Sequence, residues 1–63
     1  MNTIYIVSSF KMEGQSTLTF KEEEKDKALS IFNKLREDLS IYQASLCQHE
    51  SGHNVVSIDS FLR

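Results

Sequence analysis

The chain contains no proline, only two glycines and a single cysteine among its 63 residues. Residues that interrupt regular structure are therefore rare, and the hydrophobic content is 40%. This composition is typical of an ordered globular domain rather than a disordered segment. The lone cysteine, Cys47, excludes a disulfide within the chain. Because secreted domains of this size usually depend on disulfides, we expect a cytoplasmic protein.

Two further absences narrow the classes of partner. No apolar run approaches the ~20 residues of a membrane-spanning helix, and the apolar residues 1–10 lack a basic leader and a small-residue cleavage site. The seven basic residues are interleaved with nine acidic ones, for a net charge of -2. Binding to a nucleic-acid backbone requires clustered Lys and Arg. The sequence therefore predicts neither a membrane nor a nucleic-acid partner.

The length predicts one domain that spans residues 1–63. A chain this short buries only about 60% of the surface that its unfolded state exposes. One helix on one small sheet is therefore near the lower limit for independent stability.

Residues 21–39 have the spacing of an amphipathic helix. Ala28, Phe32, Leu35 and Leu39 recur at intervals of three or four residues, which places them on one face. Acidic residues 22–24 suit the positive end of the helix dipole. Thr19 and Glu22 fit a Ser/Thr-x-x-Glu capping box.

Strand patterns flank this helix on both sides. The β-branched and alternating segments predict strands at residues 3–11, 16–20, 41–49 and 54–62. Paired residues of a hairpin share a face, so the apolar parities favour three-residue loops at 12–14 and 50–52. These loops pair Ile6 with Phe20 and Leu46 with Val56.

The predicted fold is thus α+β: a small ββαββ domain whose antiparallel sheet has one helix packed on one face. The strand order does not follow from the sequence, and the joining of the two hairpins edge to edge is an assumption. The predicted core consists of apolar residues from all five elements: Ile4, Ile6, Leu18, Phe20, Ala28, Phe32, Leu35, Leu46, Val56 and Ile58.

The same parities place a second apolar set on the face that the helix leaves uncovered. A solvated sheet face is mostly polar, and a contiguous apolar set on it marks an interface. The alternative is a scatter of strand-forming residues on a wet sheet. The predicted protein-binding residues on this face are Tyr5, Val7, Ile41, Val55 and Phe61.

Residues 49–53 read His-Glu-Ser-Gly-His, the H-E-x-x-H string of zinc proteases. That motif requires a helix, whereas here Gly52 and the flanking strand patterns predict a hairpin tip. With three-residue loops, His49 and His53 lie opposite each other and Cys47 shares the face of His49. These three residues offer a weaker alternative, metal binding completed by Glu50 or by a second chain, because a structural zinc site needs four ligands.

No other residues suggest chemistry. The serines lack a predicted His–Asp pair. We therefore predict a non-enzymatic protein without catalytic residues, cofactor or resident metal. In size, acidity and element order the chain resembles small phage and mobile-element proteins that inhibit host machinery, including anti-CRISPR and anti-restriction proteins. This resemblance implies a module that occupies a surface of a larger host protein. The alternative is a structural or regulatory homodimer that buries its uncovered sheet face.

Overall fold

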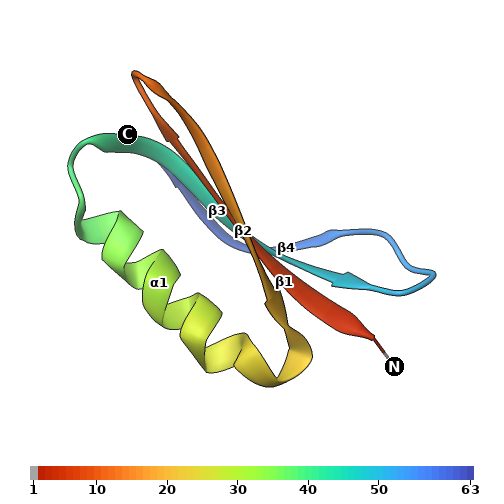
Figure 1. Cartoon of the computed structure of the whole chain (residues 1–63). Helices are drawn as coiled ribbons and strands as arrows, with labels where there is room; N and C mark the ends of the chain where they lie inside the picture. Colours follow the sequence, from red (N-terminus) through yellow and green to blue (C-terminus); the bar gives the residue numbers. More distant parts are fainter. Residues whose placement is uncertain (1) are drawn as a thin grey trace.

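A computed structural model describes residues 2–63 and shows one sheet of four strands with one helix (Figure 1). The elements follow one another as β1 (Thr3–Lys11), β2 (Gly14–Lys21), a 3₁₀ turn η1 (Glu22–Glu24), α1 (Lys25–Glu37), β3 (Ile41–Glu50) and β4 (Val56–Leu62). This order confirms the predicted ββαββ fold.

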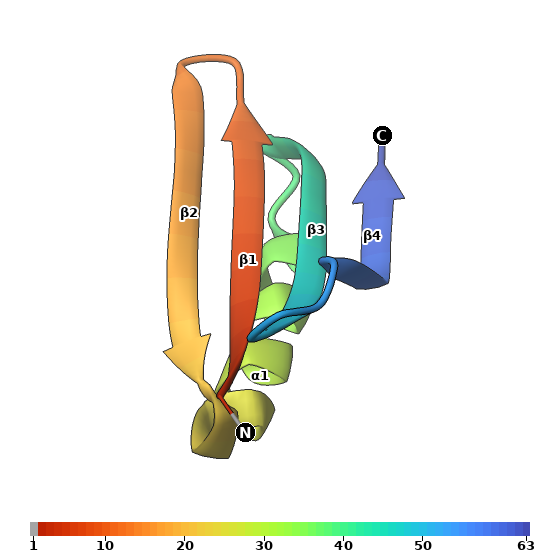
Figure 2. The same cartoon turned by 90° about the vertical axis from the view of Figure 1, so that its right-hand side faces the viewer.

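All strand pairs are antiparallel, and the strand order is β2-β1-β3-β4. The two hairpins therefore join edge to edge through β1 and β3, as assumed from the sequence. Figure 2 shows β1 and β3 in the middle of the sheet, with β2 and β4 as its edges.

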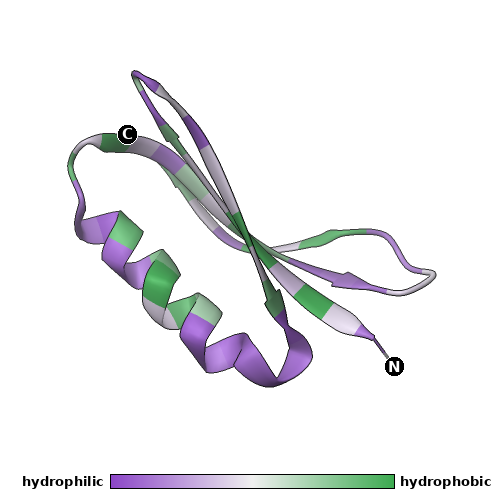
Figure 3. Ribbon diagram, viewed as in Figure 1, coloured by the Kyte–Doolittle hydropathy of each residue, from purple (hydrophilic) through white to green (hydrophobic). Residues whose placement is uncertain are grey.

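The helix lies on one side of the sheet, mainly over β3 and β1 and less over β2 (Figure 1). Its beginning, directly after β2, is hydrophilic (purple in Figure 3). Ala28 and Phe32 lie in the core as the spacing predicted, with Leu29, Ile31 and Leu35 packed beside them. The core is completed by strand residues: Tyr5, Val7, Phe20, Ile41, Ala44 and Leu46.

The first hairpin contradicts the predicted register. Its turn has two residues, Met12 and Glu13, and Lys11 pairs with Gly14. Tyr5 therefore pairs with Phe20, and the odd-numbered side of β1 faces the helix. Gly14 follows the turn at φ +154°, a conformation that residues with a side chain rarely adopt.

Ile4 and Ile6 are consequently half-buried on the uncovered side, and their assignment to the core is wrong. Phe20 is in the core as predicted. Leu18 faces the helix side opposite Val7, but 48% of it is exposed because α1 covers β2 less than it covers β1 and β3.

The second hairpin also differs from its prediction. Residues 51–55 connect β3 to β4, and Gln48 pairs with Val56, whereas Leu46 pairs with Asp59. An irregularity between Leu46 and Cys47 separates these two registers. Val56 is 60% exposed and Ile58 is 41% exposed, so their assignment to the core is wrong, whereas that of Leu46 is confirmed.

Hydrogen bonds define the two ends of the helical segment. At its start the Lys21 N–H donates to Glu24 Oε1 at 2.9 Å, so the predicted Thr19–Glu22 capping box is wrong. At its end Asp38 Oδ1 accepts hydrogen bonds from the Ser40 N–H at 3.0 Å and the Ser40 hydroxyl at 2.7 Å. This Asp turn ends the helix without glycine or proline. Leu39, predicted within the helix, lies in the turn with 84% of its surface exposed.

Candidate functional site: the uncovered face of the sheet

The candidate site is the sheet face that points away from α1, here named the open face. Successive side chains of a strand point to opposite faces, so the even-numbered residues of β1 lie on it. Paired residues of neighbouring strands share a face. The open face is defined by these residues: Ile4, Ile6, Ser8, Phe10, Gln15, Thr17, Thr19, Lys21, Gln43, Ser45, Cys47, His49, Ser57, Ser60 and Leu62.

The centre of the open face is a row of apolar side chains along β1. Ile6 lies between Thr19 on β2 and Cys47 on β3. At one end of the row, the ring of Phe10 is 6.4 Å from the ring of Tyr42. Neutral polar side chains on the neighbouring strands flank this row on both sides.

This apolar row makes the outer side of β1 more apolar than its inner side. The inner side presents Thr3 and Ser9 to the core besides Tyr5 and Val7, and both polar residues are buried. The outer side carries Ile4, Ile6 and Phe10, all half-buried, with only Ser8 among them. A strand with one buried face normally has the opposite arrangement.

The open face is also nearly free of charge. Of the seven basic and nine acidic residues of the chain, only Lys21 falls on it, opposite Ile4 at one end. Lys11 and Asp59 lie on the helix side by their pairing with Ile41 and Leu46. Depletion of charge distinguishes the centres of protein–protein interfaces from the remaining surface.

The five predicted binding residues do not form this surface. Tyr5, Val7 and Ile41 are 6%, 1% and 1% exposed in the core, so their placement on the uncovered face is wrong. Phe61 packs beside them, with its ring 5.9 Å from that of Phe32. Val55 is 54% exposed but lies in the loop before β4.

Two irregular positions explain these placements. The two-residue turn reverses the two faces of β1 relative to the prediction. A second irregularity opposite Phe10 and Lys11 leaves Tyr42 without a partner in the β1–β3 register and places Ile41 on the helix side. The greater apolarity of Ile4, Ile6 and Phe10 is visible in the sequence, but by itself it predicts a buried side, which is why Ile4 and Ile6 stand in the predicted core.

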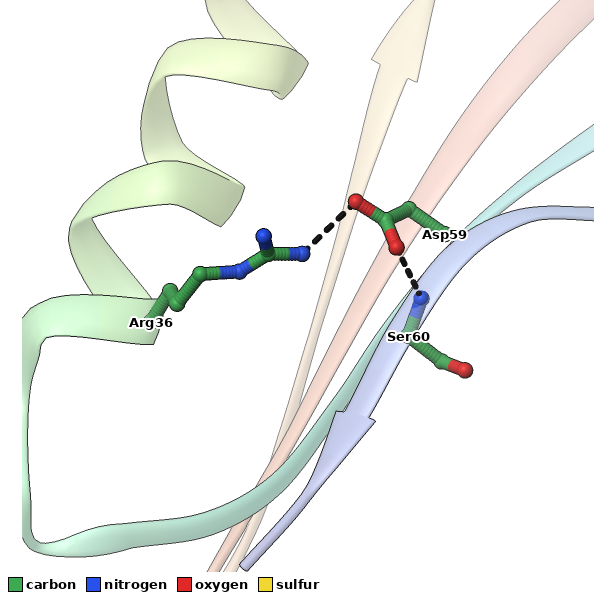
Figure 4. A network of polar contacts seen from close by, with 3 residues as sticks. All are labelled: Arg36, Asp59 and Ser60. Atoms are coloured by element: carbon green, nitrogen blue, oxygen red, sulfur yellow. Dashed lines mark hydrogen bonds and ion pairs between the residues drawn. The ribbon is translucent and has the colours of Figure 1, made fainter.

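On the helix side, α1 is joined to the edge strand β4 by a charged contact. The Arg36 guanidinium lies 2.6 Å from Asp59 Oδ2, and Asp59 Oδ1 accepts a hydrogen bond from the Ser60 N–H (Figure 4). The guanidinium also lies 5.2 Å from the ring centre of Phe32. Asp59, on the helix side of β4, therefore has a structural partner.

The residues of the H-E-x-x-H string do not converge. His49 lies opposite Ile4 within β3, whereas His53 lies in the following loop, where its N–H donates to the Glu50 carbonyl at 2.9 Å. The predicted register that set His49 against His53 is wrong, because Gln48 already pairs with Val56. Among residues 2–63 no three His, Cys, Asp or Glu side chains are grouped so that they could hold a metal ion.

A smaller apolar group lies at the end of the sheet next to Phe10. Met12 and Leu39 are 96% and 84% exposed, and with Tyr42 they line one hollow between the β1–β2 turn and the end of α1. The contact between Tyr42 and Phe10 connects this hollow to the open face.

No protein-family model, curated protein or solved structure matches this chain. Within residues 2–63, no helix combines the length and apolarity needed to cross a lipid bilayer.

Proposed function

We propose that this protein is a non-enzymatic binding module that acts in the cytoplasm by placing its open face on a surface of a larger protein. The observation that carries the proposal is the reversed polarity of β1, whose more apolar side points away from the helix. Burying a side chain such as Ile or Phe contributes about 1.5–3 kcal/mol. The fold leaves part of this contribution unused, and a partner that covers Ile4, Ile6 and Phe10 would supply it.

The composition of the open face indicates the kind of surface that fits it. A central apolar row flanked by Thr, Ser and Gln suits a partner patch that is apolar in the middle and neutral at its border. Most charged residues of the chain lie on the helical segment, in the turns and at the sheet ends, and Asp59 in the centre of β4 faces the helix side. The size, acidity and element order support a phage or mobile-element inhibitor of a host protein as the class of binder.

A second candidate is a homodimer in which two open faces pack against each other. The lack of acidic residues on the open face favours this homodimer. Each copy carries a net charge of -2, but none of its acidic residues would lie in the contact between two open faces. Four strands about 4.8 Å apart and about eight residues long present roughly 500 Å². Two such faces bury about 1,000 Å², the lower limit for a specific interface.

The test is a matched pair of charge substitutions in the tagged protein. Ile6→Glu places a carboxylate at the centre of the open face, whereas Leu39→Glu introduces the same charge on the exposed turn after α1. The protein that wild type and Leu39→Glu both retain from host cells is purified, and its dissociation constant is measured by calorimetry for all three chains.

We expect the Ile6→Glu substitution to weaken binding by at least ~30-fold, the effect of losing one central residue. Both variants should melt within a few degrees of wild type, because neither side chain is in the core. Equal affinities for the three proteins would contradict the proposal. A self-associating wild type that becomes monomeric through Ile6→Glu would favour the homodimer of open faces.

A further inference from the structure

The edge strand β2 lacks the features that protect sheet edges. Proteins shield exposed edges with charged residues, proline, bulges or short strands. From Gln15 to Phe20 the strand carries no charge and no proline, and its pairing with β1 has no register shift. The other edge, β4, pairs through an irregular register and carries Asp59 in its centre.

The register identifies which backbone groups of β2 point outward. A two-residue turn makes Lys11 and Gly14 the first hydrogen-bonded pair, and such pairs alternate with non-bonded ones. The non-bonded residues Gln15, Thr17, Thr19 and Lys21 therefore direct their N–H and C=O groups away from β1. Consistent with this assignment, the Lys21 N–H donates to the Glu24 side chain and not to β1.

The outward N–H and C=O groups of three residues, Gln15, Thr17 and Thr19, thus have no partner in the strand ladder. These residues are arranged symmetrically about Thr17. An antiparallel partner with two-fold symmetry at Thr17 would pair Thr17 with its own copy and Gln15 with Thr19. About six hydrogen bonds between the chains would then satisfy all the outward groups of these residues. A symmetry axis at Leu18 would pair Gln15 with Lys21. That pair would require the Lys21 N–H, which already donates a hydrogen bond to the Glu24 side chain.

Side-chain chemistry favours the same register. Two-fold pairing at Thr17 brings Lys21 of one copy level with Glu13 of the other, at both ends of the contact. It also places Thr17 opposite Thr17 and Leu18, which is 48% exposed, opposite Ser16. Cross-strand Thr pairs and opposite charges both stabilise antiparallel strands.

We propose that two copies of this chain join through their β2 edges, with the two-fold axis at Thr17, to form one continuous eight-stranded sheet. Residues of the same parity pair in this arrangement, so both helices lie on one side and both open faces on the other. The dimer leaves the open face uncovered and doubles its extent. This inference does not depend on the proposed binding function.

The outward direction of the Thr17 N–H provides the main test. Thr17→Pro removes a donor that β1 does not use, and proline is tolerated on edge strands in this orientation. By light scattering with size-exclusion chromatography, we expect wild type to have twice the 7.3 kDa mass of one chain and the variant to have the mass of one chain. Circular dichroism shows whether the variant is folded.

If Thr17→Pro unfolds the chain, Thr17→Lys decides, because it sets two like charges directly opposite each other at the axis. Ser57→Lys is the matched control, because it introduces the same charge on the other edge strand. A cross-link tests the axis itself: in a Cys47→Ser background, Thr17→Cys should oxidise to a covalent dimer, since paired Cα atoms ~5.5 Å apart allow a disulfide.

A wild-type mass of 7.3 kDa at millimolar concentration would overturn the proposal, as would a folded Thr17→Pro or Thr17→Lys variant that remains dimeric. Loss of the dimer through Ile6→Glu with its retention in the Thr17 variants would instead assign self-association to the open face.

Discussion

Phe32 is the residue on which the two layers of the molecule meet. Its side chain is 1% exposed, its ring lies 5.9 Å from that of Phe61 on β4, and the Arg36 guanidinium lies 5.2 Å from its centre. Helix, edge strand and a charged contact therefore all depend on one aromatic ring.

Phe32→Ala is accordingly expected to leave the chain largely unfolded at room temperature. Truncating a buried aromatic residue costs about 3–5 kcal/mol. A domain of this length has about 3–9 kcal/mol in total, at 0.05–0.15 kcal/mol per residue. Thermal unfolding followed by circular dichroism measures the loss. The control is Leu39→Ala, which shortens an apolar residue that is 84% exposed and should leave the melt unchanged.

Single residues also show where the sequence was insufficient. Spacing alone placed Ala28 and Phe32 correctly, because a 3.6-residue period has one apolar face. In β1 both faces contain large apolar residues, so alternation cannot decide which side is buried. The structure buries the side with Tyr5, Val7, Thr3 and Ser9, although the side with Ile4 and Ile6 is more apolar.

At the scale of elements, both hairpins were found from the sequence but neither register was. Strand β1 has the predicted bounds, and the helix and other strands differ from theirs by a few residues. A register depends on the length of the turn, and a change of one residue moves every side chain to the other face. Gly14 and Gly52 mark turns in the sequence without indicating how many residues precede them.

The end of α1 is an element boundary that depends on a charge. Hydrogen bonds from the Ser40 hydroxyl and then from the Ser40 N–H lower the pKa of Asp38, and the charges of Lys11 and Arg63 act in the same direction. A carboxyl group with a lowered pKa in the folded state stabilises that state above its unfolded pKa. The stabilisation is lost as the pH falls through the folded pKa.

We therefore expect Ser40→Ala to raise the pKa of Asp38 toward 3.8, the value without these contacts, as measured by NMR titration of its carboxyl carbon. In denaturant unfolding, Asp38→Asn should lower stability relative to wild type at neutral pH. The difference should begin to decrease below about pH 4, where the carboxyl group becomes protonated in the unfolded state, and it should be lost once the pH falls through the lower folded pKa. A difference that is independent of pH would show that the charge of Asp38 has no part in ending the helix.

At the scale of the whole molecule, the helix lies mainly over the two central strands on one side of the four-stranded sheet, and no element of residues 2–63 covers the other side. The helix lies over β1 and β3 and reaches β4 through Arg36 and Phe32. The sequence predicted this two-layer architecture but not the strand order, because five amphipathic elements in the order ββαββ admit few two-layer arrangements. It did not show which surface remains open, since that depends on the two turns.

Arg63 connects the edge strand to the remainder of the fold. Its guanidinium donates hydrogen bonds to the Arg36 carbonyl near the end of α1 and to the Ile41 carbonyl at the start of β3, the latter at 2.5 Å. It also lies 4.5 Å from the ring centre of Phe61, and its backbone N–H donates to the Tyr42 carbonyl. A cation at the end of a helix is favoured by the helix dipole.

Arg63→Ala should therefore lower the free energy of unfolding by about 1–2 kcal/mol, which combines charged hydrogen bonds with an exposed cation–π contact. For a domain of this size the melting temperature should fall by roughly 4–15 °C. Arg63→Lys is the matched variant: it keeps the charge but cannot reach two carbonyls with one planar group, so it should recover only part of the loss. Full recovery by lysine would mean that charge alone matters. An unchanged melt in both variants would show that β4 is held by its pairing with β3 and by Phe61 without help from Arg63.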